Sequence, residues 1–160
     1  MKRLPYLTGI LFFLMVLLLT NAWYLYRPVL DFSCSSLFQQ DNIEDDFHMT
    51  SNTLFTFTPD GTGFISMDGT VNHLGHEYKL RRDYRFTYKH AGGNKWQFSH
   101  VNFILSGSEN VPAGLVERNF YSLEKKKNNI FIYVAKVNDV PGVRIIGGLY
   151  SPAFMCFSNN

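Results

Sequence analysis

The sequence predicts an all-β domain behind a single N-terminal transmembrane helix. Two observations lead to this prediction. The stretch from Leu4 to Tyr26 is apolar and uncharged, and most of the remaining chain alternates apolar with polar residues between turn sequences rich in Gly, Pro and Asn. Connections are short and helical periodicity is nearly absent, which indicates an antiparallel β-meander. Because such a sheet must hide its edges, we expect a small closed barrel or a compact sandwich.

The apolar stretch is long enough to cross a membrane, since about 20 helical residues span a hydrocarbon core of roughly 30 Å. Lys2 and Arg3 precede it and predict a cytoplasmic N-terminus by the positive-inside rule. The alternative is a cleaved signal peptide, with Thr20-Asn21-Ala22 as the cleavage site. We favour an anchor because the bulky segment Trp23–Tyr26 suits an outer aromatic belt and not a cleavage site.

The composition predicts three segments. Residues 1–27 form the cytoplasmic N-terminus and the membrane helix, residues 28–52 a juxtamembrane connector, and residues 53–160 the β domain. Within the connector, Ser35–Gln40 carries a weak helix signal. The β domain has enough residues for one hydrophobic core.

The β domain begins with a predicted hairpin, Leu54–Thr58 and Gly63–Met67, and Asp68-Gly69 is expected to form a second turn. The clearest strand is His76–His90, with a largely aromatic face and a charged face. Lys95–Leu105 follows, and its apolar phase slips near Ser99 and His100, which predicts a β-bulge. The remaining strands are expected at Phe120–Lys125, Ile130–Val137, Val143–Tyr150 and Ala153–Phe157. Closed as a barrel, this meander would be lipocalin-like.

Cys34 and Cys156 are the two cysteines, and they lie near opposite ends of the exported part of the chain. In an oxidising compartment they are candidates for one disulfide that ties these ends together. Two buried free thiols are the alternative.

The aromatic face of the long strand and the strand after it suggest a ligand cavity. The candidate residues are Tyr78, Arg82, Tyr84, Phe86, Tyr88, Trp96 and Phe98. An apolar interior with one arginine would suit an amphipathic small molecule with an anionic end. An ordinary core whose tyrosine hydroxyls reach its rim is the alternative.

Other sites are not indicated. His73 and His76 form a close pair, but zinc would need two further ligands. No nucleophile elbow or paired carboxylates stand out, so we expect no catalytic residues, no metal, no cofactor and no enzymatic activity. The formal net charge of +2, with acidic and basic residues interleaved, gives no sign of direct nucleic-acid binding.

Several features together resemble the FidL-like family of small enterobacterial inner-membrane proteins. They are the Lys/Arg N-terminus, a span that ends in Asn21–Tyr26, the segment Phe64–Thr70 and a cysteine near the C-terminus. The resemblance implies a bacterial inner-membrane protein with a single span and a periplasmic β domain. It also implies pairing with a membrane-bound ToxR-type transcriptional regulator, by analogy with ToxS and VtrC companions. VtrC-type companions are implicated in binding bile salts. No ligand residue carries over to this chain.

Two main hypotheses follow. In the first, the chain is an accessory protein that binds and stabilises a ToxR-type regulator and senses a small amphipathic ligand. In the second, it is a stand-alone periplasmic ligand-binding or envelope-structural β protein. A small periplasmic enzyme is a third and weaker hypothesis.

Overall fold

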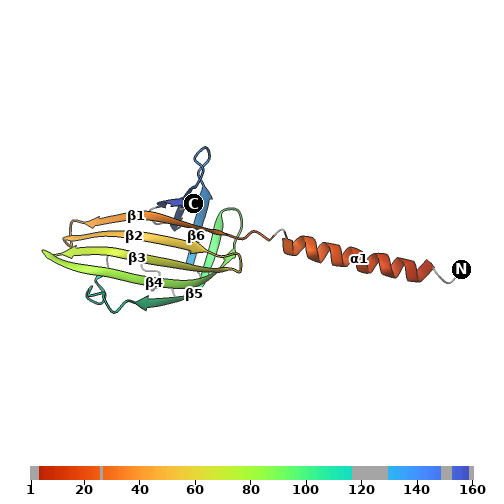
Figure 1. The fold of residues 1–160 in the computed structure, drawn as a ribbon, viewed down its shortest axis with the longest axis horizontal. Helices are drawn as coiled ribbons and strands as arrows, with labels where there is room; N and C mark the ends of the chain where they lie inside the picture. Colours follow the sequence, from red (N-terminus) through yellow and green to blue (C-terminus); the bar gives the residue numbers. More distant parts are fainter. Residues whose placement is uncertain (1–3, 26, 117–129, 149–152, 159–160) are drawn as a thin grey trace.

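A computed structural model describes residues 4–25, 27–116, 130–148 and 153–158. Over these residues, one helix precedes eight antiparallel strands that close into a barrel in chain order (Figure 1). The elements are α1 (Leu4–Leu25), β1 (Phe32–Asn42), β2 (Phe47–Phe57), β3 (Thr62–His73), β4 (His76–His90), β5 (Lys95–Leu105), β6 (Ile130–Lys136), β7 (Val143–Gly148) and β8 (Ala153–Ser158). The all-β prediction is confirmed, and of the two expected architectures the chain adopts the barrel.

Helix α1 projects away from the barrel, and its apolar side chains from Ile10 to Leu19 are exposed (Figure 1). Its side chains are described over residues 8–22. Within the described part of the chain, no helix meets the length and apolarity needed for a membrane crossing.

The segment assigned to a connector, residues 28–52, contains β1 and the first half of β2. The helix signal at Ser35–Gln40 was wrong, because these residues pair with β2 along the whole of β1. The inner face of β1 includes Cys34 and Ser36, both buried. Because these inward side chains are small, the sequence of β1 lacks a clear alternation of large apolar and polar residues. Pairing with β2, and not a local sequence pattern, therefore defines this strand.

The turn expected at Asp68-Gly69 was also wrong, because β3 runs unbroken from Thr62 to His73. Gly69 is needed for close approach to β2, since a Cβ at this position would collide with the carbonyl oxygen of Thr50. The turn lies at Leu74-Gly75 instead, where φ is 51° and 76°. Positive φ at two successive residues is typical of the tight turn that joins twisted hairpin strands.

The alternation predicted for residues 76–90 is present in β4. Leu80, Tyr84 and Phe86 are buried in the core, whereas Arg81 and Arg85 are exposed. The bulge expected near Ser99 and His100 is confirmed: pairing of β4 with β5 shifts opposite Phe86, and His100 has φ of 52°. The predicted strand Phe120–Lys125 lies outside the described residues.

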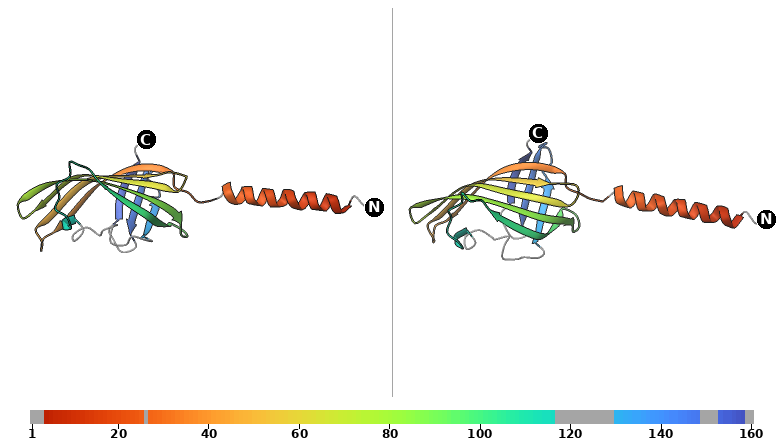
Figure 2. Two further views of the ribbon diagram at one scale, coloured as in Figure 1. Left: turned by 90° about the horizontal axis from the view of Figure 1, so that it is seen from below. Right: turned by 60° about the horizontal axis from the view of Figure 1, so that its bottom comes forward.

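Closure of the barrel depends on a short seam between the first and last strands. Within the described residues, register pairs join β1 to β8 at two positions, Cys34 with Ser158 and Ser35 with Phe157. At this seam Cys34 and Cys156 form a disulfide, with a Cα–Cα distance of 5.4 Å. Strands β6–β8 run across the direction of the long strands β1–β5 (Figure 2). The seam between β1 and β8 is one of the places where these two sets of strands meet.

Loss of the disulfide is expected to destabilise the barrel. The bridge joins positions 122 residues apart, and the chain-entropy model assigns about 4 to 5 kcal/mol to a loop of this size. The double variant Cys34→Ala/Cys156→Ala should lose about 2 to 5 kcal/mol of unfolding free energy in urea denaturation. Wild-type protein in reductant should behave like the variant. Rapid alkylation of both thiols in the folded, unreduced wild type would contradict the bridge.

Candidate functional site

The residues proposed for a ligand cavity lie together in the barrel interior, where they pack against one another. Phe86 and Phe98 stack with ring centroids 4.1 Å apart, and the Tyr88 and Trp96 rings meet edge to face at 5.5 Å. Tyr84 and Arg82 are also buried, and Tyr78 is half-buried. Most of this set therefore contributes to a packed aromatic core. Aromatic pairs of this kind stabilise the fold by more than the burial of their apolar area alone.

Arg82, the residue proposed for the anionic end of a ligand, already has a carboxylate partner. Its Nη2 lies 2.5 Å from Oε1 of Glu109, and its Nε donates to the same oxygen at 2.7 Å. The two side chains are only 6% and 3% exposed. Glu109 was missed in the sequence because it lies in the loop after β5, where no periodicity marks an inward-facing residue.

The loop that carries Glu109 extends the sheet beyond the end of β5. Asn110 bonds Lys79 through both its side chain and its backbone, and the backbone N–H of Arg81 donates to Glu109. Burial by itself lowers the pKa of Arg82, but the hydrogen bond and charge of Glu109 outweigh it and raise that pKa above its ordinary value. Arg82 therefore stays charged at every physiological pH.

Tyr88 ties the barrel to the chain segment that leads from α1. Its hydroxyl accepts from the backbone N–H of Leu30 at 3.1 Å and lies 2.6 Å and 2.7 Å from the carbonyl oxygens of Leu30 and Thr58. Burial raises the pKa of Tyr88, so the phenol keeps its proton for these bonds. This contact fixes where the connecting segment enters the barrel.

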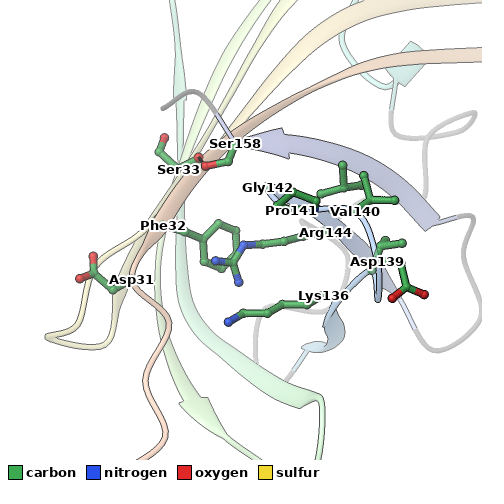
Figure 3. Close-up of a pocket in the computed structure, with 12 residues that line it drawn as sticks. Asp31, Phe32, Ser33, Lys136, Asp139, Val140, Pro141, Gly142, Arg144 and Ser158 are labelled. Carbon is green, nitrogen blue, oxygen red and sulfur yellow. Dashed lines mark hydrogen bonds between the residues drawn. The ribbon is translucent and has the colours of Figure 1, made fainter.

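A pocket of about 690 Å³ lies at the end of the barrel where β1 starts, β8 ends and the β6–β7 hairpin turns. We call it the hairpin pocket; it is lined by Asp31, Phe32, Ser33, Lys136, Val137, Asp139, Val140, Pro141, Gly142, Val143, Arg144 and Ser158. Figure 3 shows Lys136 and Arg144 extending side by side into it from β6 and β7. The guanidinium carbon of Arg144 lies 3.8 Å from the centre of the Phe32 ring, a cation–π contact.

The outer surface of β6–β8 carries exposed large apolar side chains. Phe131, Tyr133, Met155 and Phe157 are each between 38% and 56% exposed. Ile145, on the strand between them, pairs in register with Met155 and joins the set across the sheet. We call these five residues the apolar outer face. Apolar side chains grouped on one exposed surface commonly mark interaction sites.

No group of His, Cys, Asp and Glu side chains able to hold a metal ion occurs within the described residues. Sequence patterns did not reveal either surface feature. The cations of the hairpin pocket lie on short strands, and which of their residues face inward depends on strand register. The residues of the apolar outer face come from three short strands and meet only through the same register.

These features define a small β-barrel domain that follows an apolar N-terminal helix and exposes large apolar side chains on β6–β8. A family model described as "FidL-like putative membrane protein" matches residues 69–156, from β3 to the disulfide cysteine of β8. This is more than half of the chain, which therefore belongs to the FidL-like family. A search of curated proteins gives no match.

The Arg82–Glu109 pair gives a direct stability prediction. Glu109→Gln removes the charge that compensates buried Arg82, and breaking such a pair costs about 3 to 5 kcal/mol. Urea denaturation should show this loss, whereas Asp68→Asn, which removes the exposed 3.3 Å ion pair with Arg81, should change stability by no more than about 0.5 kcal/mol. Equal effects of the two substitutions would show that Arg82 is not buried as described.

Proposed function

We propose that this chain is a non-enzymatic, single-pass inner-membrane accessory protein whose periplasmic barrel binds and stabilises a ToxR-type regulator. The observation that carries the proposal is the apolar outer face, because exposed aromatic and methionine side chains grouped on one sheet are typical of protein-binding surfaces. Membership of a family described as membrane proteins supports a membrane location. The ToxR type of the regulator is inferred from the resemblance between this family and known companions of such regulators.

Helix α1 is the proposed anchor. Its 22 residues would extend about 33 Å at the rise of an α-helix, which matches a hydrocarbon core of roughly 30 Å. The sequence from Leu4 to Leu25 contains no charged side chain. Lys2 and Arg3 would hold the N-terminus in the cytoplasm.

The mechanism follows from mass action. A companion that binds only the folded periplasmic domain of the regulator raises the stability of that domain, by about 2.7 kcal/mol when the companion is at 100 times the dissociation constant. In this proposal the barrel acts on transcription through the regulator that it binds. A ligand that favours the complex would bias the regulator further.

The anchor is tested by topology. A reporter that is active only outside the cytoplasm, fused after Asn160, should be active while the protein stays in the membrane pellet after a carbonate wash. The reason is that an uncleaved α1 would retain the barrel at the outer surface of the membrane. Release of a soluble fragment that begins near Trp23 would instead establish a cleaved signal peptide.

The docking surface is tested by co-purification of the tagged full chain with a co-expressed ToxR-type regulator in mild detergent. Wild type should recover the regulator stoichiometrically, and Met155→Gln/Phe157→Gln should reduce recovery at least tenfold. Loss of anchor side chains costs about 2 kcal/mol or more, and each 1.4 kcal/mol is a factor of ten.

The control for this experiment is Ile43→Gln. Ile43 is 89% exposed in the β1–β2 turn, outside the apolar outer face, and its substitution should leave recovery unchanged. If wild type recovers no regulator in several detergents, the stand-alone periplasmic protein replaces the accessory one.

A further inference from the structure

Two cations face each other inside the hairpin pocket. Lys136 and Arg144 are direct partners in the register between β6 and β7, so they lie on the same face of the sheet. Like charges opposite each other in a sheet are destabilising. This face is the inner one, because Arg144 also pairs in register with Cys156, whose side chain is fully buried.

No carboxylate among the described residues offsets this repulsion at ion-pair distance, because none of the ion pairs in that part of the chain includes Lys136 or Arg144. Asp31 and Asp139 line the same pocket, but Figure 3 shows them on opposite sides of the cation pair. Burial lowers the pKa of Arg144, as expected for a charge that loses water without gaining an anion.

The contact between Arg144 and Phe32 leaves the guanidinium ready to bind an anion. A guanidinium stacked on a ring presents its N–H donors along its edge, and that edge fits phosphate or carboxylate oxygens in a bidentate manner. The Lys136 ammonium lies beside it and adds a second positive charge (Figure 3). An anion between the two tips would turn a repulsive pair into an attractive site.

The walls of the pocket suit an amphiphile more than a bare ion. Val137, Val140, Pro141 and Val143 line it beside the cations, and a volume of about 690 Å³ is typical of small-molecule sites. Phe32 lies seven residues after the end of α1, and a chain of this length reaches at most about 25 Å. If α1 is the membrane anchor proposed above, the pocket lies close to the membrane surface.

We propose that the hairpin pocket binds a phosphate-type anion, with Arg144 and Lys136 on its oxygens, and that an acidic phospholipid headgroup supplies this anion. The choice of source rests on the proposed anchor. A zwitterionic headgroup fits less well, because its choline cation would add a third positive charge to the pocket.

Native mass spectrometry of the full chain in an uncharged detergent tests the proposal. The delipidated protein is mixed with equal amounts of phosphatidylglycerol and phosphatidylcholine of identical acyl chains. Wild type should retain phosphatidylglycerol in at least tenfold excess, and Arg144→Gln and Lys136→Gln should each reduce that preference toward equality. Arg85→Gln, which removes an exposed cation from the outer face of β4, should keep it.

Absence of a preference in wild type, or a preference that survives both pocket substitutions, would overturn the site. Displacement of phosphatidylglycerol by an equal concentration of inorganic phosphate would overturn the lipid as source, since it would show that the apolar walls contribute nothing. The assay needs neither a regulator nor a defined topology. A negative result here would therefore count against the phospholipid site alone. The regulator-binding face is tested separately, by co-purification with the Met155 and Phe157 variants.

Discussion

The short seam between β1 and β8 is the constraint on which the rest of the barrel depends. A meander of eight strands has two free edges unless its first and last strands meet, and among the described residues two register positions and one disulfide join them. By comparison, β1 pairs with β2 along its whole length. The covalent bond therefore reinforces the backbone pairing of the described seam residues.

The features assigned to function gather at this seam and on the strands that it holds. Phe32 and Ser158, which line the hairpin pocket, flank the disulfide on β1 and β8, and the apolar outer face covers β6–β8. On the opposite side of the barrel, β2–β4 are long and paired along most of their length, with an aromatic core behind them. The molecule thus combines a half of long, extensively paired strands with β6–β8, which, in the described part of the chain, join it through four register pairs between β5 and β6 on one side and through the seam on the other.

The sequence predicted the long strand, the bulge in β5 and the all-β class because period-two alternation is strong where large aromatic side chains face the core. It failed for β1, where Cys34 and Ser36 are small inward residues, and for Gly69, where backbone approach and not a turn requires glycine. The partner of Arg82 could not be predicted, since Glu109 reaches it from a loop. Lys136 and Arg144 meet only through strand register, which local pattern does not determine.

The central claim is that the seam holds β6–β8, and with them the hairpin pocket and the apolar outer face, against the half formed by the long strands. Hydrogen–deuterium exchange of the full chain, measured by mass spectrometry with the disulfide intact and after reduction, tests it most directly. We expect reduction to speed exchange across residues 130–158 and in β1, while β3 and β4 keep their protection. Unchanged exchange in β6–β8 after complete reduction of the Cys34–Cys156 bond would contradict the claim.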